Sequence, residues 1–140
     1  MQWLKDSIQV TTNRKGMHPI TSLVEKRIRD WNIQEGICFL FIQHASASIL
    51  INESYDPSAK ADMEGFLDRL SPENHAWHQH TLEGADDSPA HLRTMLTQTD
   101  LTIPIDNSQL SLGTWQGIYL FEHRRRGQHR HILIRCLKVG

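Results

Sequence analysis

The sequence predicts an α+β fold, namely a single domain with a mixed, mostly antiparallel, barrel-like sheet and about three helices. The chain has 140 residues, and single domains commonly contain roughly 100–200. Segments with strand and helix patterns follow one another without the regular alternation that a doubly wound parallel sheet requires. No linker, internal repeat or low-complexity tract interrupts them, so we expect one domain over residues 1–140.

The first third of the chain predicts three strands and one helix. Residues 2–12 mix apolar and polar side chains in a strand-like pattern, and a turn follows them. Apolar residues then recur at helical spacing over 20–31. A continuous apolar run over 37–43 is typical of a strand buried on both faces, and residues 46–52 predict the next strand.

Two further helices are marked by a capping side chain followed by proline. Asp56-Pro57 and Ser88-Pro89 each place a side-chain oxygen at the N-cap and proline at the first helical position. We expect the inner face of the first of these helices to carry Ala59, Met63, Phe66, Leu67 and Leu70. We expect the inner side of the second to carry Leu92, Met95 and Leu96. A polar loop over 71–81 separates the two helices.

The remaining chain predicts a series of strands. They are expected at 101–105, 109–112, 115–122 and 131–139. A turn at Asp106-Asn107-Ser108 joins the first two, since asparagine tolerates a positive φ.

Composition and charge exclude several classes of protein. Fifteen basic and sixteen acidic residues leave a net charge of −1, which gives no electrostatic reason to expect nucleic acid or an anionic membrane as a partner. The longest apolar run, residues 37–42, is far shorter than the ~20 residues that span a bilayer. Asp6 interrupts the N-terminal stretch where a secretory signal would be apolar. We expect Cys38 and Cys136 to be buried thiols, and the protein to be cytoplasmic.

His44 is the first candidate for a functional side chain. It ends a strand that is expected to be buried, where a ligand or catalytic base is held well. The small residues after it leave room for a ligand, and Ser46 and Ser48 share one face of the next strand. The alternative is a hydrogen-bonded core histidine, with Asn52-Glu53 as a solvated turn.

The second candidate lies around the helix that follows residue 88. The chain has nine histidines, and three of them fall within residues 75–80, where they would bind zinc or form a solvated loop. Acidic residues over 83–87 either complement the helix N-terminus or bind Mg²⁺ through oxygen. His91 lies in the first helical turn, where a protonated imidazole is unfavourable, so a neutral ring ready to act as a ligand is favoured.

Two further candidates lie near the C-terminus. Gly113 and Gly117 bracket Thr-Trp-Gln, which indicates either a surface for a flat or phosphorylated group or a bulge at a sheet corner. Four arginines lie within residues 122–130, in a predicted hairpin. Arg124 and Arg130 would converge on a phosphate, or these side chains would be solvated.

Four motifs together resemble those of the YjbQ-like family, whose members are also described as secondary thiamine-phosphate synthase enzymes. The motifs are Gln-His-x-Ser-Ala-Ser at 43–48, Asn-Glu-x-x-Asp-Pro at 52–57, Glu-Gly-Ala-Asp-Asp-x-Pro-Ala-His at 83–91, and Gly-Thr-Trp-Gln-Gly at 113–117. The resemblance covers essentially the whole chain. It implies a small α+β protein built on a mixed β-barrel and assembled as a homotrimer.

The resemblance also implies a set of site residues. The family's histidines, as metal ligands or catalytic groups, match His44, His80 and His91. Its polar positions match Asn52, Glu53, Asp62, Asp86 and Asp87, and its basic positions match Arg124 and Arg130. Other histidines, at 75, 78, 129 and 131, match nothing in the family and are expected at the surface. Ala45 stands where the family usually has threonine, which removes a hydroxyl beside His44.

The activity that the resemblance implies joins hydroxymethylpyrimidine diphosphate to thiazole phosphate and releases pyrophosphate. Such a transfer needs Mg²⁺, basic groups on the leaving pyrophosphate and a dry pocket. In this hypothesis the catalytic residues are His44, Glu53, Asp87 and His91, and Mg²⁺ is held by Glu53, Asp86 and Asp87. The substrate-binding residues are Ser46, Asn52, Trp115, Gln116, Arg124 and Arg130.

Two alternatives remain open. One is a hydrolase of a small phosphorylated substrate, in which His44, His80 and His91 hold Zn²⁺ while Glu53 or Asp87 activates water. The other is a trimeric protein that binds a small phosphorylated metabolite without catalysis.

Overall fold

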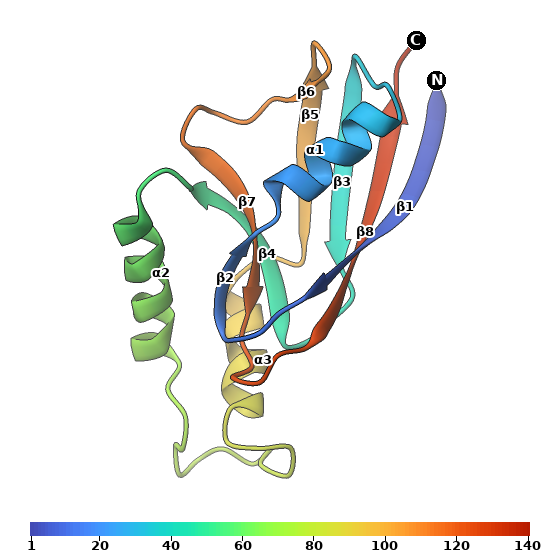
Figure 1. Cartoon of the computed structure of the whole chain (residues 1–140). Helices are drawn as coiled ribbons and strands as arrows, with labels where there is room; N and C mark the ends of the chain where they lie inside the picture. Colours follow the sequence, from blue (N-terminus) through green and yellow to red (C-terminus); the bar gives the residue numbers. More distant parts are fainter.

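Two antiparallel sheets curve around a shared apolar core and form a half-barrel (Figure 1). The computed structural model describes residues 1–140. The strands are β1 (Gln2–Thr11), β2 (Gly16–Pro19), β3 (Gly36–Ile42), β4 (Ala47–Glu53), β5 (Asp100–Asp106), β6 (Gln109–Leu110), β7 (Gln116–Glu122) and β8 (His129–Lys138). The helices are α1 (Thr21–Asp30), α2 (Pro57–Leu70) and α3 (Asp87–Leu96). The predicted α+β class with three helices is confirmed.

The strand order explains how the half-barrel is built. The larger sheet has the order β1-β8-β3-β5-β6, and the smaller has the order β2-β7-β4. Every pairing between these strands is antiparallel, so the sheet is more regular than the mixed one that the resemblance implies. Strand β2 lies in a segment where the sequence predicts no strand. It is short, and its final residue, Pro19, is tolerated because β2 lies at the sheet edge.

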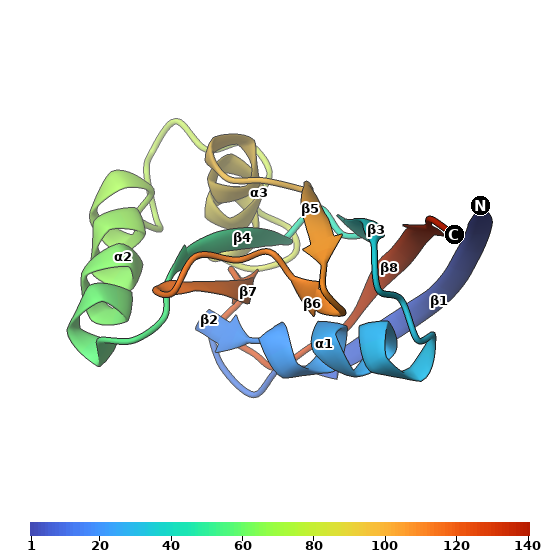
Figure 2. The same cartoon turned by 90° about the horizontal axis from the view of Figure 1, so that it is seen from above.

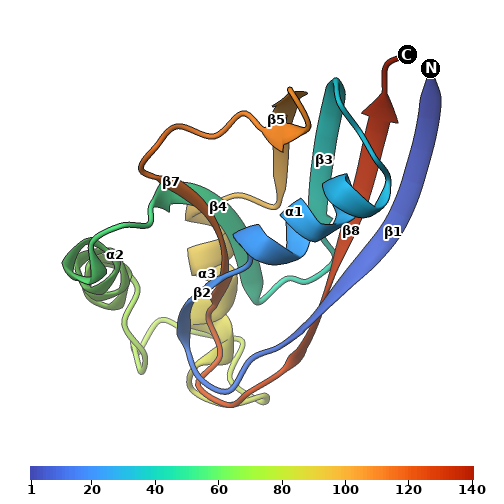
Figure 3. The same ribbon diagram turned by 45° about the horizontal axis from the view of Figure 1, so that its top comes forward.

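The core lies between the two sheets and is closed by α1. Figure 3 shows α1 lying across the sheets. Its Val24 and Ile28 are buried among inward-facing residues of both sheets. Cys38 and Cys136 face each other across β3 and β8, and both are buried free thiols, as expected. None of the three helices combines the length and the apolar character that a membrane crossing demands.

The two predicted helix starts have different outcomes. Asp56 caps α2 as expected, and its carboxylate accepts the backbone N–H of Ser58 at 2.9 Å. Helix α3 begins at Asp87, so Ser88 lies inside the helix rather than at its cap. Asp86 occupies the N-cap position without a capping hydrogen bond, because its carboxylate is bound elsewhere, to Arg124.

The expected inner faces of α2 and α3 are largely wrong. Of the apolar residues predicted to face the core from α2, only Leu67 is buried, and Phe66 is 63% exposed. On α3, Met95 and Leu96 are exposed, and the helix buries Asp87, Pro89, Ala90 and Arg93 instead. Helical periodicity identifies an apolar stripe but not what covers it. Viewed from above, α2 stands apart at one side of the sheets (Figure 2).

The outward face of the larger sheet carries apolar side chains and no helix. Outward positions alternate with buried ones on β3 and β8, because successive side chains of a strand point to opposite faces. Phe41 and Trp3 are the most exposed apolar residues of this face, at 49% and 54%. The half-buried apolar members are Ile37, Phe39, Leu133 and Leu137.

A buried histidine follows β7 and makes stability depend on pH. The Nε2 atom of His123 lies 2.9 Å from the hydroxyl of Ser48, and both residues are buried. Burial and the nearby charge of Arg93 lower the pKa of His123 to about 3. The ring is therefore neutral in the folded protein at neutral pH.

We expect the free energy of unfolding to fall as pH decreases from about 6.5 toward 3, by up to about 1.4 kcal/mol per pH unit from His123 alone. The reason is that the unfolded histidine takes up a proton in this range and the folded one does not. Urea unfolding of the wild type and of His123→Gln over this range tests it. The variant should lose less stability on acidification, and equal slopes would contradict the assignment.

Candidate metal centre

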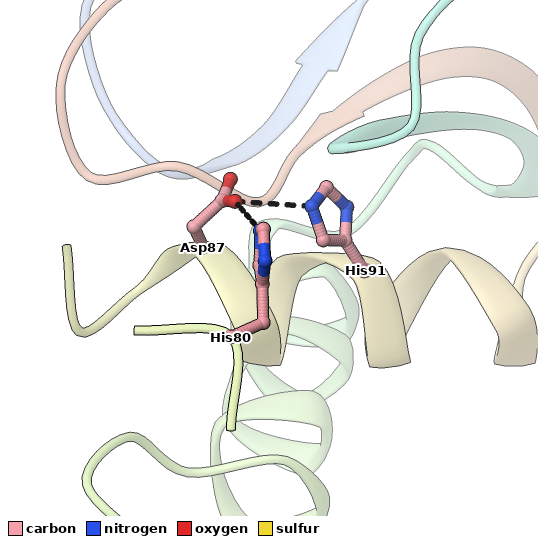
Figure 4. Close-up of side chains that lie close together, drawn as sticks. All are labelled: His80, Asp87 and His91. Atoms are coloured by element: carbon pink, nitrogen blue, oxygen red, sulfur yellow. Dashed lines mark hydrogen bonds and ion pairs between the residues drawn. The ribbon is translucent and has the colours of Figure 1, made fainter. Parts of the chain in front are cut away.

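Three side chains converge at the N-terminal end of α3 and form the candidate metal centre: His80, Asp87 and His91 (Figure 4). One potential ligand atom from each lies within 4.8 Å of the other two. Asp87 and His91 are one helical turn apart on α3, and His80 comes from the loop before it. The carboxylate is buried, whereas the side chains of His80 and His91 are 51% and 39% exposed. The group is therefore open to solvent on its histidine side.

The hydrogen bonds of His91 point to a positive charge within this group. Its Nδ1 atom lies 2.7 Å from the carbonyl oxygen of Ala45, and a carbonyl only accepts, so Nδ1 carries a proton. Its Nε2 atom lies 3.0 Å from Oδ2 of Asp87. A neutral ring would direct an Nε2 lone pair at an anionic oxygen, which is repulsive. Either a second proton or a metal cation must therefore lie between them.

His80 shares the same carboxylate oxygen. Its Nε2 atom lies 2.6 Å from Oδ2 of Asp87, so two imidazoles converge on one oxygen atom. Two imidazoles and a carboxylate suit zinc and similar divalent metals better than Mg²⁺, which prefers oxygen ligands. A backbone carbonyl on the distal nitrogen of a histidine is also a common outer partner of a metal ligand. The residues present therefore fit a zinc-type ion.

Arg124 orients the carboxylate from behind. It donates from Nη1 to Oδ1 of Asp87 at 2.6 Å and from Nε to Oδ2 of Asp86 at 3.1 Å. Its Nη2 group also donates to the carbonyl of Glu83 at 2.9 Å. Burial alone would raise the pKa of Asp87, but the hydrogen bond from His80 and the charges of His91 and Arg124 outweigh it and lower that pKa. The carboxylate is therefore ionised and available to a cation.

His44 lies outside this group, although the resemblance places it among the metal ligands. Its Nε2 atom accepts the backbone N–H of His131 at 2.9 Å, and its Nδ1 atom lies 3.3 Å from Nη1 of Arg130. Burial and the charge of Arg130 lower the pKa of His44. His131, expected at the surface, is half-buried and stacks on His44. The third member of the observed group is therefore Asp87 and not His44.

Ser46 and Arg130, expected to bind substrate, belong to a buried network instead. Arg130 donates from Nε to Glu122 at 2.8 Å and from Nη2 to the Ser46 hydroxyl at 3.0 Å. The side chain of Arg130 is only 5% exposed, and that of Glu122 is fully buried. This guanidinium is therefore enclosed and paired rather than directed at solvent.

Four other candidates lie at the far end of β4 and β7. Glu53 pairs with Gln116 in the register, whereas the end next to the metal centre pairs Ala47 with Glu122. Six residues of strand separate the two ends by about 20 Å. The four residues at the far end are Asn52, Glu53, Trp115 and Gln116. Within one chain they cannot take part in the same site as His91.

Local contacts explain most of these distal side chains. The Glu53 carboxylate accepts the backbone N–H of Asp56 at 3.1 Å, and Gln116 accepts that of Gly113 at 2.8 Å. Trp115 is 56% exposed and packs edge-on against Tyr55. The carboxylates proposed for Mg²⁺, at 53, 86 and 87, are therefore not brought together within the chain.

One signal for the observed group is present in the sequence. Asp87 and His91 have i, i+4 spacing, which places two side chains on the same helical face. The sequence hypotheses give Asp87 a role on water or Mg²⁺ rather than as a partner of both histidines. The contacts of Arg124 with Asp86 and Asp87 span 38 and 37 positions, and no local pattern indicates them.

Comparison with known proteins agrees with the sequence resemblance. A family model described as UPF0047 protein YjbQ-like matches residues 6–139. UPF0047 protein sll1880 of Synechocystis sp. is 38% identical over 130 residues, which cover 93% of this chain and 88% of that protein. UPF0047 protein YjbQ of Escherichia coli O157:H7 is 36% identical over 132 residues, which cover 94% and 95%.

Solved structures show the same fold. A protein of unknown function from Sulfolobus solfataricus superposes with a TM-score of 0.89 at 28% identity, covering 99% of both chains. The conserved hypothetical protein TT1486 from Thermus thermophilus gives a TM-score of 0.84 at 30% identity, covering 94% of this chain and 99% of that one.

The buried ion pair between Arg130 and Glu122 allows the role of Arg130 to be tested. We expect Arg130→Met to lower the free energy of unfolding by about 3–5 kcal/mol, because Glu122 would remain buried without its partner. Adding Glu122→Leu should recover a substantial part of this loss. Urea unfolding at neutral pH measures both. If Arg130→Met kept wild-type stability and lost only metabolite binding, Arg130 would belong to a binding site after all.

Proposed function

The chain belongs to the YjbQ-like UPF0047 family, and from the geometry of its metal centre we propose that it is a divalent-metal-dependent hydrolase of a small phosphorylated metabolite. The names of the relatives above state no activity, so the site must supply the argument. The observation that carries the proposal is the position of His91 between the Ala45 carbonyl and the Asp87 carboxylate. This arrangement suits a metal-ligating imidazole with a fixed tautomer.

The chain's own residues would have distinct roles. His80, Asp87 and His91 would hold the ion, and it would act as a Lewis acid on a phosphoryl oxygen. Arg124 would keep Asp87 ionised and oriented, since it holds the other carboxylate oxygen. The exposed histidine side leaves coordination positions for substrate and water.

A polar depression beside Asp86 supports a phosphorylated substrate. It has a volume of about 550 Å³ and no apolar lining residue, and its lining combines three arginines and Gln128 with the acidic residues Glu83 and Asp86. Arg125 pairs with Glu73 at 3.2 Å, whereas Arg126 forms no ion pair. None of the three candidate metal ligands lines the depression, but Asp86 of its lining precedes Asp87 in the chain. An unpaired guanidinium in this depression suits the oxygens of a phosphate.

The same depression supports a second candidate, the thiamine-phosphate synthase-type transferase. Its volume and the unpaired guanidinium of Arg126 suit a diphosphate leaving group. The Mg²⁺ ligands assigned to that reaction are separated, however, because Glu53 lies at the far end of β4. The ligand chemistry therefore favours the hydrolase. Binding without turnover is the third outcome that an assay would reveal.

We expect the purified protein to bind one zinc ion per chain, and Asp87→Asn or His91→Ala to weaken this binding at least about 100-fold. Affinity should also fall as pH is lowered, because both Nε2 atoms must be free of protons. Competition with a chromophoric chelator measures it. His75→Ala, an exposed histidine of the same loop, is the matched control and should bind zinc as the wild type does.

The zinc-loaded protein should hydrolyse a phosphomonoester, and His91→Ala should remove this activity. A parallel reaction would contain Mg²⁺, hydroxymethylpyrimidine diphosphate and thiazole phosphate, with detection of thiamine phosphate. Coupling that depends on Mg²⁺, with no hydrolysis, would replace the hydrolase with the transferase. Saturable phosphate-ester binding without either product would leave only a metabolite-binding role.

The homotrimer is also a proposal, and the uncovered face of the larger sheet supports it. An exposed apolar face of this kind usually marks an interaction surface. We expect sedimentation to give the mass of three chains, and Phe41→Glu to shift the protein toward the monomer, because a charge would enter that face. Leu82→Glu, at a fully exposed apolar residue on a loop, should leave the mass unchanged. A monomeric wild type would refute the proposal.

A further inference from the structure

A groove between α2, β4 and the end of α3 lies outside the proposed metal centre. Its volume is about 640 Å³, and seven of its eleven lining residues are hydrophobic. Of its lining residues, Phe121 and Leu67 are buried, whereas Phe66 and Leu96 are exposed. Pockets for small molecules commonly have volumes of roughly 300–1,000 Å³ and mainly apolar linings.

The lining of this groove retains much exposed apolar surface. Phe66 of α2 is 63% exposed and Leu96 of α3 is 58% exposed, although both line the groove. These are the same residues whose predicted contact with the core is absent. Covering them with an apolar group would remove this surface from water and so favour binding.

The charge of the groove comes from one carboxylate. Asp62 is the only charged residue among its lining, and it makes no ion pair and no side-chain hydrogen bond. The other acidic residues within the later turns of α2 are paired: Glu64 with Arg14 at 3.5 Å, and Asp68 with Lys15 at 2.9 Å. Asp62 therefore offers an uncompensated negative charge beside an apolar surface.

We propose that this groove binds an amphipathic organic cation, with a protonated amine or quaternary ammonium at Asp62 and an apolar body against Phe66 and Leu96. The carboxylate disfavours anionic ligands, and no basic lining residue offsets it. The ring of Phe66 adds a favourable face for a cation. The Oδ1 atom of Asn52 accepts the N–H of Glu53, which leaves its amide N–H groups for a polar substituent.

This site is separate from the metal centre. Leu96 follows His91 by five residues on α3, which is about 7.5 Å along the axis and about 140° around it. A ligand in the groove would therefore meet a different face of the helix. Its binding requires no metal, so it can be tested independently of the proposed hydrolase.

The test uses three probes with one apolar body: 4-phenylbutylamine, 4-phenyl-1-butanol and 4-phenylbutyrate. They are titrated into the full-length protein in the presence of a chelator, and binding is followed by amide chemical shifts in NMR. We expect the amine to bind about three- to tenfold more tightly than the alcohol, and the carboxylate most weakly. The shifts should centre on α2, β4 and the end of α3.

Substitutions separate the two parts of the recognition. Asp62→Asn should reduce the affinity of the amine to that of the alcohol, and Phe66→Ala should weaken the binding of all three probes. Asp30→Asn, which removes an exposed carboxylate from α1, is the matched control and should change nothing.

Three outcomes would overturn the proposal. The first is equal affinity for the three probes, and the second is a set of shifts centred elsewhere. The third is that no probe binds to the wild type and that Phe66→Glu dissociates an oligomer. This result would mean that a second copy of the chain covers the groove. In the first two cases, retained zinc binding would leave the metal centre unaffected.

Discussion

The enclosed carboxylate of Glu122 is the constraint on which the rest of the structure depends. It lies at the end of β7 in the smaller sheet, and it accepts hydrogen bonds from Thr12 at 2.7 Å and from Arg130. Arg130 lies in β8 of the larger sheet, and Thr12 directly follows β1 of the same sheet. A buried charge must be paired and hydrogen-bonded, so this residue forces the two sheets together at one end.

The metal centre derives its geometry from the same strand end. The backbone N–H of Arg124 is bound to Glu122 at 3.1 Å, and the side chain of Arg124 then reaches Asp86 and Asp87. Between them, His123 turns inward to Ser48. Three consecutive residues therefore join the two sheets, fill the space between them and orient the carboxylate that faces the two histidines.

Patterns confined to short segments were predictable from the sequence. The strands other than β2, the α2 cap at Asp56 and the turn at Asn107, whose φ is 51°, follow from local side-chain and backbone preferences. What covers a helix is a tertiary property, and the exposed Phe66 shows the limit of periodicity. The partners of Arg130 could not be predicted from the sequence either. The local sequence of a basic residue in a hairpin is the same whether its side chain binds a phosphate or a buried glutamate.

The contact between His91 and Ala45 has a consequence for sequence divergence. The group that holds the imidazole is a main-chain carbonyl, so it is supplied by whatever amino acid occupies position 45. Alanine supplies this acceptor as well as a threonine would. The hydroxyl of Thr94 also lies 3.2 Å from this carbonyl oxygen, on the side of α3, although its shorter contact is with the carbonyl of His91 at 2.8 Å. The backbone path thus sets the orientation of His91, and a substitution at position 45 that preserves this path would not change it.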